Sequence, residues 1–381
     1  MRGVAAAAAA VLVLVAGACS ADEPSAERPS GPVASSAADS TGSPSGTEPT
    51  GDPARRPGPL TIAVAGDVHF EGVLRERLAD PTTALAPATA TLAAADLAIV
   101  NLETSVGTGG RPAPDKRYTF QAPPTAFRAL AAAGVDVATM ANNHALDYGT
   151  APLPGTFEAI AKARVAEPPL VVVGLGRDVV AAFRPARTEV DGTTVATIGA
   201  TVAADDPTAD PTGHWAATED SPGTADAIDP RRLLRSVRAA DRSADVVVVY
   251  MHWGIQGEAC PSEGQRSLAR DLVTAGADVV VGSHTHALQG DGRVGEGYVA
   301  YGLGNYAWYT QSPEPTGVLT LTVRPPTSPE GRATVTGAQW DPARVGADGL
   351  PAPLADSAGF AARLAALREC AGLAGPSDAG R

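Results

Sequence analysis

One pattern recurs four times along this chain and limits the folds that it can adopt. An Ala-rich stretch leads to an Asp, a run of β-forming residues follows, and a polar cluster ends the run. The four runs begin after Asp96, Asp136, Asp245 and Asp278. Apolar runs that alternate with helical stretches are typical of α/β units whose strands are buried on both faces. Ligand sites in such sheets form beyond the carboxyl ends of the strands, which is where the polar clusters fall.

The polar clusters hold most of the histidines of the chain. A fifth cluster follows a similar apolar run at 60–65. The clusters contain Asp67 and His69; Asn101 and Glu103; Asn142, Asn143 and His144; His252, Trp253 and Gly254; Ser283, His284 and His286. Of the six histidines, only His214 lies elsewhere. A single histidine of this kind is usually hydrogen-bonded without a metal, but five at corresponding positions favour one shared site.

The residue types in these clusters are those that bind divalent metal ions. The seven candidate ligands are Asp67, His69, Glu103, Asn143, His252, His284 and His286. Nitrogen and oxygen ligands without thiolate select Zn, Mn, Fe or a similar ion. Seven ligands exceed the four of a closed zinc site, so we expect two divalent ions. Such a pair can activate water at neutral pH.

The spacing of His284 and His286 predicts how they share the ions. In an extended segment, side chains two residues apart lie on one face. The two imidazoles could therefore both bind one ion or bind one ion each. Asp67 and His69 repeat this spacing with one carboxylate, and Glu103 could bridge two ions.

Other segments predict a second sheet. Residues 184–190 and 193–200 flank Asp191 and Gly192, which form a favoured two-residue hairpin turn. The later β-like segments that indicate the second sheet are 299–302, 317–323 and 333–340. We therefore expect an α/β fold with a two-sheet core flanked by helices. Residues 205–229 are rich in Pro, Asp and Thr and are expected to form a long surface loop.

The N-terminal part of the chain predicts export. Arg2 precedes an apolar run at 4–16 that is short for a membrane span, which favours a signal peptide over 1–19 rather than a buried helix. Cys19 follows small residues, as in a bacterial lipoprotein processing site, so we expect lipidation there. Residues 20–59 consist mainly of Pro, Ser, Gly, Thr and Ala and are expected to form a disordered linker.

The remainder is expected to form a domain over 60–325 and a C-terminal extension over 326–381, a strand and a helix that pack on the domain. If Cys19 carries lipid, Cys260 and Cys370 remain. An exported compartment permits these two to form a disulfide, and two unrelated thiols are the alternative.

The net charge disfavours one class of partner. The chain has 29 Lys and Arg against 42 Asp and Glu, a net charge of −13. Sequence-independent binding of nucleic acid or of an anionic membrane needs a net basic face, so we expect no nucleic-acid partner. Locally, residues 107–118 follow Glu103 and carry Arg111, Lys116 and Arg117, which could bind an anionic substrate or stay solvated.

The clusters and their surroundings form an ordered set of motifs. They are Gly66 with Asp67; Asn101 with Glu103; Asn142, Asn143 and His144; His252, Trp253 and Gly254 with Glu258; Ala275 to Asp278; and Gly302 with Asn305. This set resembles the CapA-type family of poly-γ-glutamate capsule synthesis, within the calcineurin-like metallophosphoesterases. The resemblance covers residues 60–323 and implies a four-layer αββα, metallophosphoesterase-like fold.

The resemblance also implies roles for the candidate ligands. Asp67, His69 and His286 would hold the first ion, Glu103 would bridge, and Asn143, His252 and His284 would hold the second. His144 would protonate the leaving group or stabilise charge. Two positions depart from the usual phosphoesterase pattern: Glu103 stands where Asp is usual, and Ala145 stands where an acidic residue usually follows the Asn-His pair.

Further residues are candidates for supporting the ligands or contacting substrate. Glu258, near His252, and Asn101 could accept or donate hydrogen bonds from outside the ligand set. Lys116, Arg117 and Asn305 are the candidates for substrate contact.

These observations predict an exported hydrolase with two metal ions, which is either a lipid-anchored lipoprotein or secreted. Its substrate would be an anionic envelope polymer or precursor, in the synthesis, export or attachment of a poly-γ-glutamate-type capsule, with capsule-synthesis membrane proteins as partners. A metal-dependent amide hydrolase is a second enzymatic hypothesis. Two hypotheses without catalysis are a metal-containing scaffold that binds polymer, and a set of histidines that only hydrogen-bond within the core.

Overall fold

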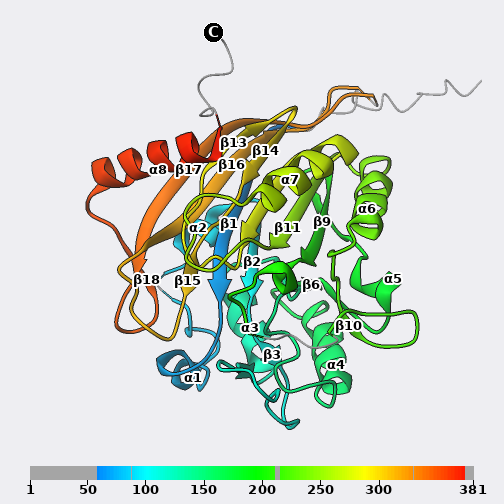
Figure 1. Ribbon diagram of the computed structural model, residues 1–381, viewed down its shortest axis with the longest axis vertical. Helices are drawn as coiled ribbons and strands as arrows, with labels where there is room; N and C mark the ends of the chain where they lie inside the picture. The colour runs from blue at the N-terminus through cyan, green and yellow to red at the C-terminus, as the bar shows by residue number, and fades with distance from the viewer. Residues whose placement is uncertain (1–57, 87, 211–214, 329, 374–381) are drawn as a thin grey trace, which may run out of the picture. The chain divides into compact units, whose positions relative to one another are not determined.

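The computed structural model describes residues 58–86, 88–210, 215–328 and 330–373 (Figure 1). The predicted signal peptide, Cys19, the predicted linker as far as residue 57, and His214 lie outside the described residues. Within the described part, no helix combines the length and the apolar character that a membrane span requires.

The first large sheet has eight strands and contains the first and the last described strands of the chain. In spatial order they are β18 (Pro351–Pro353), β17 (Thr334–Val345), β16 (Pro315–Arg324), β1 (Leu60–Val68), β2 (Leu97–Leu102), β5 (Val137–Thr139) and β6 (Val171–Val173), and β15 (Asn305–Ala307) also pairs with β1. Strands β1, β2, β5 and β6 are parallel, whereas β16 runs antiparallel to β1.

The second large sheet has six strands. They are β13 (Asp291–Val294), β14 (Gly297–Ala300), β12 (Val279–Ser283), β11 (Val246–His252), β9 (Thr193–Thr201) and β8 (Ala186–Val190). Two small pairs complete the strands: β3 (Ser105–Val106) with β4 (Gln121–Ala122), and β7 (Leu175–Gly176) with β10 (Gly223–Thr224). Strands β9, β11, β12 and β14 are parallel, so their carboxyl ends meet at one edge.

The helices connect and cover these sheets. They are α1 (Val73–Arg77), α2 (Ala90–Ala94), α3 (Thr125–Ala132), α4 (Leu153–Ala163), α5 (Val179–Ala182), the 3₁₀ helix Ala203–Asp205, α6 (Arg231–Asp241), α7 (Glu263–Ala275) and α8 (Ser357–Ala371). Helix α7 begins with a capping box between Ser262 and Gln265 and ends at Gly276, whose φ of 116° is left-handed.

Apolar side chains pack in three layers. Val64 on β1 and Val248 on β11 belong to one cluster between the two sheets. Phe127 on α3 packs in a second cluster against the first sheet. Leu233 on α6 and Leu272 on α7 pack in a third against the second sheet, where Figure 1 shows α6 and α7 beside β9 and β11. This arrangement confirms the predicted four-layer αββα fold.

The recurring Asp has one structural role at all four positions. Each Asp side chain accepts a hydrogen bond from a backbone N–H at the start of the neighbouring parallel strand. The pairs are Asp96 with Thr61 (2.7 Å), Asp136 with Ala98 (2.7 Å), Asp245 with Thr194 (2.8 Å) and Asp278 with Val247 (2.9 Å). Each carboxylate thus satisfies a donor at a strand end and ties two strands together.

The hairpin prediction is confirmed, and two other predictions are corrected. Strands β8 and β9 are antiparallel around Asp191 and Gly192, whose φ angles of 46° and 81° suit a type I′ turn. The three later segments do not form a sheet together: β14 joins β12, whereas β16 and β17 extend the first sheet beside β1. The sequence pattern of a strand does not reveal which sheet edge is free to receive it.

The segment 205–229 is the second correction. It is not a loop on the surface, because β10 pairs with β7, and the backbone N–H of Thr201 donates to the carbonyl of Ala225 (3.0 Å). Asp206 is buried. These contacts bring the segment against the carboxyl end of β9.

The C-terminal helix is attached to the second sheet at several points. Cys370 on α8 is joined to Cys260 by a disulfide, with 5.7 Å between their Cα atoms. Arg368 donates to the buried Asp291 on β13 (3.0 Å). Phe360 packs with Leu288 in a separate apolar cluster.

Candidate metal centre

The predicted site residues converge from strand ends of both large sheets. Asp67 lies near the end of β1, and His252 is the last residue of β11. Gly66 allows the close approach that this needs, because a Cβ at Gly66 would lie 1.8 Å from the carbonyl oxygen of Gly304. The backbone N–H of Asp67 donates to that same oxygen (3.0 Å). The motifs around Gly66 and Gly304 thus meet in space.

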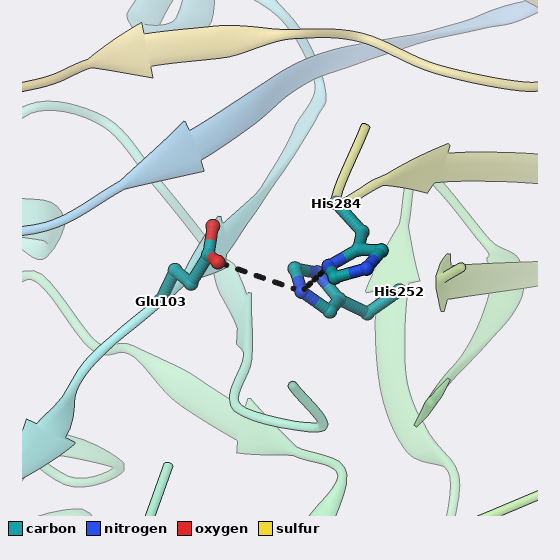
Figure 2. A group of neighbouring side chains, drawn as sticks. All are labelled: Glu103, His252 and His284. Atoms are coloured by element: carbon teal, nitrogen blue, oxygen red, sulfur yellow. Dashed lines mark hydrogen bonds and ion pairs between the residues drawn. The ribbon is translucent and has the colours of Figure 1, made fainter. Parts of the chain in front are cut away.

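Two groups of possible ligands share one carboxylate. Glu103, His252 and His284 form one group (Figure 2), and Asp67, Glu103 and His286 form the other. Within each group the ligand atoms lie within 4.8 Å of one another. Glu103 therefore stands where the sequence predicted a bridging ligand, and His284 and His286 belong to different groups.

Glu103 is the strongest sign that the site is built for cations. Both of its carboxylate oxygens are buried without a hydrogen-bond partner among the described residues. Burial, followed by the nearby charge of Asp67, raises the pKa of Glu103 well above its usual range. A buried carboxylate without a partner is costly, and two divalent ions would supply the missing counter-charge. The donor set therefore fits the implied ions.

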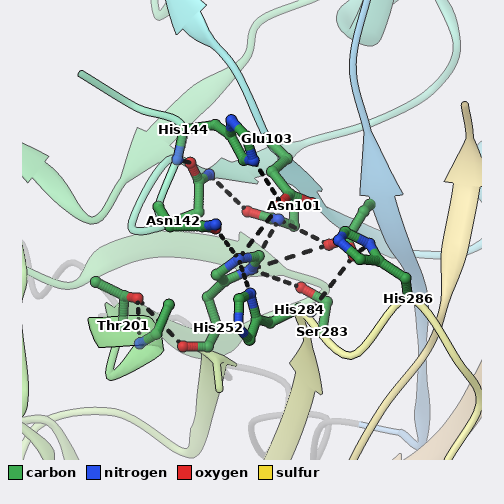
Figure 3. A network of polar contacts seen from close by, with 12 residues as sticks. Asn101, Glu103, Asn142, His144, Thr201, His252, Ser283, His284 and His286 are labelled. Carbon is green, nitrogen blue, oxygen red and sulfur yellow. Dashed lines mark hydrogen bonds and ion pairs between the residues drawn. The ribbon is translucent and has the colours of Figure 1, made fainter. Parts of the chain in front are cut away.

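His252 is held in an orientation that suits metal binding (Figure 3). Its Nδ1 lies 3.1 Å from the Ser283 hydroxyl and 3.2 Å from the Asn101 amide nitrogen. Its Nε2 lies 2.7 Å from Oδ1 of Asn143 and 3.1 Å from Nδ1 of His284. Burial lowers the pKa of His252 well below its usual range, which favours the neutral imidazole that binds metals.

Asn101 lies beside two candidate ligands, Asp67 and His252. Its amide nitrogen donates to Oδ1 of Asp67 (2.8 Å), and its amide oxygen accepts from Asn142 (3.0 Å). These bonds connect the ends of β1 and β2 with the segment that carries Asn143.

The segment that carries His284 and His286 is not extended, which corrects the conformation expected from the sequence. Both residues have left-handed φ angles, 98° for His284 and 56° for His286. Such angles cost a non-glycine residue free energy and are concentrated at functional sites. The sharp bend after β12 directs the two imidazoles into different ligand groups.

The carboxylate that orients His284 has no counterpart among the residues predicted from the sequence. Nε2 of His284 lies 3.1 Å from Oδ2 of Asp206. Although burial acts to raise the pKa of Asp206, hydrogen bonds from His284 and Thr208 lower it below its usual range. Glu258, which was expected in such a role, has an exposed side chain, so that prediction is wrong. The segment 205–229 is rich in Asp, and nothing in its composition indicates that Asp206 is the buried one.

His144 also has a carboxylate partner that was not predicted. Its Nδ1 lies 2.6 Å from Oδ2 of Asp147, and its Nε2 lies 3.7 Å from Oε1 of Glu103. Burial raises the pKa of Asp147 to about 7, and the charge of Lys116 opposes that rise. Asp147 therefore supplies, three residues after His144, the acidic partner that Ala145 lacks.

The prediction that Lys116 contacts substrate is corrected. Its side chain is fully buried, and its ammonium donates to Asp147 (2.5 Å) and to the backbone oxygen of Asn143. It therefore supports the segment that carries His144. Arg117 is exposed, and its place at a substrate stays a prediction. Oδ1 of Asn305 lies 2.8 Å from Nδ1 of His286, which places Asn305 beside a candidate ligand.

His69 lies in an aromatic wall beside the two groups. Its ring stacks on Phe120 with 4.6 Å between the ring centroids. The ring of Phe120 also stacks on His144, with 4.2 Å between the centroids. Its two ring nitrogens face the backbone N–H groups of Glu71 (3.3 Å) and Tyr309 (3.1 Å). Neither ligand group within the described residues includes His69, and its role as a ligand stays a prediction.

Two relatives of this chain are named for polymer synthesis. It is 33% identical over 196 residues to "PGA biosynthesis protein CapA" of Bacillus subtilis, an alignment that covers 51% of this chain and 48% of that protein. It is 32% identical over 199 residues to a "Probable polyglutamine synthesis accessory protein" of Mycobacterium tuberculosis, covering 51% of this chain and 50% of that protein. The chain therefore spans about half the length of each relative.

Solved structures show a more distant likeness. A phosphatase from Mycoplasma pneumoniae has a TM-score of 0.45 and 13% identity, over 75% of this chain and 94% of that one. The sulfate thiohydrolase SoxB of Thermus thermophilus has a TM-score of 0.42 and 15% identity, over 83% of this chain and 62% of that one.

A family model covers the candidate centre. The chain matches the model described as "Bacterial capsule synthesis protein PGA_cap" over residues 61–309. This span is more than half of the chain, and it contains all seven candidate ligands together with Asp147 and Asp206. The family resemblance that the polar clusters carry is thereby confirmed, and this protein belongs to the bacterial capsule synthesis family PGA_cap.

Proposed function

We propose that this protein is an exported, lipid-anchored hydrolase that uses two divalent ions to act on an anionic envelope polymer or its precursor. The observation that carries the proposal is the position of Glu103, shared by two ligand groups and without a hydrogen-bond partner among the described residues. A single ion would not need two groups that share a carboxylate. The number of ions and their identity as Mn, Fe or Zn are part of the proposal.

Family membership supports the link to a capsule polymer. The relatives in Bacillus subtilis and Mycobacterium tuberculosis are named for the synthesis of PGA and of polyglutamine, respectively. The proposed place of action is the cell envelope, where a signal peptide and a lipid at Cys19 would bring the chain to capsule-synthesis membrane proteins. The proposed polymer is of the poly-γ-glutamate type.

The side chains of the site have distinct proposed tasks. When bound, the two ions would lower the pKa of a water molecule and stabilise negative charge on the substrate. Asp67, Glu103 and His286 would hold one ion, and Glu103, His252, His284 and Asn143 would hold the other. His144 would donate a proton to the leaving group from Nε2, because Asp147 holds its Nδ1.

Two bond types are compatible with this site. Hydrolysis of a phosphoester and hydrolysis of an amide both need an activated water and stabilisation of developing negative charge. The hypothesis of a non-catalytic scaffold rested partly on Ala145, and the contact between His144 and Asp147 removes that part of its support. The test therefore has to distinguish turnover from metal binding alone.

The experiment uses the full-length chain loaded in turn with Mn, Fe or Zn. Bound metal is counted by elemental analysis, and turnover is measured on phosphomonoesters, phosphodiesters and γ-glutamyl amides. Asp67→Ala and His144→Ala should each abolish turnover, whereas Glu258→Ala, at an exposed position, should keep it. Bound metal without turnover on any substrate would favour the scaffold, and a chain that binds no metal would contradict both functions.

A further inference from the structure

A cavity adjoins the candidate metal centre, and among the described residues that line it only Asn143 belongs to the proposed ligand set. Its volume is about 300 Å³, and it lies between Asn142 and Asn143 on one side and residues of 201–204 and 215–226 on the other. Oδ1 of Asn143 also lies 2.7 Å from Nε2 of His252. The cavity and the metal centre therefore share a wall, and a substrate held at the centre could extend into the cavity.

The charge of the cavity lining is unusual for a site expected to bind an anionic polymer. Among the described residues that line it, Asp226 is the only one with an ionisable side chain. The others offer hydroxyl, amide or apolar groups, among them Thr218, Ser221 and Trp215. Like charges repel at short range, so a carboxylate of the substrate would be disfavoured inside this cavity.

Asp226 lacks a cationic partner within the described part of the chain. Its Oδ1 accepts a hydrogen bond from the backbone N–H of Ile228 (3.0 Å). Burial raises the pKa of Asp226, the bond from Ile228 opposes that rise, and the charge of Asp205 adds to it. A cation that enters the cavity would stabilise the half-buried carboxylate of Asp226.

The sheet register sets the distance between Asp226 and the centre. His252 is in register with Thr201 on the parallel strand β9, and Thr201 forms a parallel bridge with Asp226. These three residues therefore lie in one row across three chain segments. Adjacent strands are about 4.8 Å apart, so the backbones of His252 and Asp226 are separated by about 10 Å.

We propose that this cavity is a substrate subsite for a protonated amino group, with Asp226 as its counter-charge. The inference rests on the proposed function and narrows its substrate class. The reacting bond would lie at the metal centre, and an ammonium group a few bonds away would enter the cavity. An ammonium group on a carbon that carries no carboxylate fits this description, whereas the free α-carboxylates of γ-linked glutamate units do not.

The test compares two probes of equal size, aminobutyl phosphate and pentyl phosphate. They differ in a terminal ammonium in place of a methyl group. Binding to the full-length chain loaded with Mn is measured by calorimetry, which does not require turnover. We expect aminobutyl phosphate to bind about tenfold more tightly, as a partly buried charge pair allows.

Variants test whether Asp226 causes the difference in affinity between the two probes. Asp226→Asn keeps an oxygen acceptor for Ile228 and should bind both probes equally, with the affinity for pentyl phosphate unchanged, which also shows that the variant is folded. Asp220→Asn, at an exposed position of the same segment, should discriminate as the wild type does. Equal binding of the two probes by the wild type overturns the subsite alone. Failure of both probes to bind overturns phosphate binding at the centre and the subsite with it.

Discussion

At the scale of single residues, Glu103 is a buried carboxylate whose charge bound metal ions would compensate. It is fully buried, and its carboxylate oxygens have no hydrogen-bond partner among the described residues. Glu103→Gln removes the buried charge without changing the shape of the side chain. Without metal, we expect the variant to be more stable than the wild type by about 1–3 kcal/mol, because a neutral amide is less costly to bury than a carboxylate.

The same substitution should have the opposite effect once metal is present. Added Mn or Zn should raise the melting temperature of the wild type and leave that of Glu103→Gln nearly unchanged. Thermal unfolding with chelator and with each metal measures both effects. Glu258→Gln is the matched control, because its side chain is exposed. A wild-type melting temperature that does not respond to metal would contradict the prediction.

The buried pair of Lys116 and Asp147 predicts a coupled effect on stability. Both side chains are fully buried, 2.5 Å apart. Removing one partner leaves an uncompensated group, so Lys116→Met and Asp147→Asn should each cost about 3 kcal/mol or more. The double variant should cost less than the sum of the two by about 2 kcal/mol. Urea unfolding of the four proteins measures the coupling, and strictly additive costs would contradict it.

Residue types and their order indicated Asp67, Glu103, His252 and Asn101 as candidates, but not the carboxylates that contact His144 and His284. Asp147 lies three positions from His144 and reaches it only because the chain turns there. Asp206 reaches His284 across a sequence separation of 78 residues. A single sequence has no signal for such contacts, since many exposed Asp residues look the same in it.

At the scale of elements, the Asp that precedes each of four strands ties that strand to its neighbour. Asp278 is the most informative case, because burial raises its pKa to about 6, while the hydrogen bond from Val247 and the charge of Arg332 oppose the rise. An acid whose pKa is higher in the folded protein than in the unfolded one favours folding at low pH. This contribution is present below about pH 4 and is lost as the pH rises through about 6.

Asp278→Asn should therefore remove one pH-dependent contribution to stability. The free energy of unfolding of the wild type, relative to that of the variant, should fall by up to about 3 kcal/mol between pH 4 and pH 7. Urea unfolding of both proteins at several pH values measures this difference. A difference that does not change with pH, or that grows with it, would contradict the assignment.

Elements with a long apolar run were predictable, and edge elements were not. β11 is buried at all seven positions, and the six residues that precede His252 form an uninterrupted apolar run. β3, β7 and β10 have two residues each, which is too short for any periodicity. The sequence predicted the strands β16 and β17 but not the sheet that they join. They join the first sheet because the assembled fold leaves one edge of β1 free.

At the scale of the whole molecule, the disulfide should be a major source of stability. It closes a loop with a sequence separation of 110 residues. Loop-closure entropy for a loop of this size predicts about 4–5 kcal/mol. Cys370→Ser combined with Cys260→Ser should lower the free energy of unfolding by about that amount, as measured in urea. Reductant should destabilise the wild type and leave the double variant unchanged; equal stability of the two proteins under oxidising conditions would contradict the prediction.

A two-sheet core flanked by helices was predictable, because apolar runs and helices alternate along most of the chain, and the family resemblance implied its four layers. The stacking of Phe120 with His69 and His144 was not predictable. The stacking of Phe120 between two imidazoles depends on one loop that Asp147 holds through the backbone N–H of Phe120 (2.6 Å).

The disulfide also bears on the order in which the newly made chain can mature. Cys370 comes after every described strand of both sheets, and the loop that it closes contains His284 and His286. Oxidation to the native pair therefore has to wait until the ribosome has produced all of these strands. A chain cut short before Cys370 would keep Cys260 without its native partner, so its thiol would stay available for exchange with other thiols and disulfides.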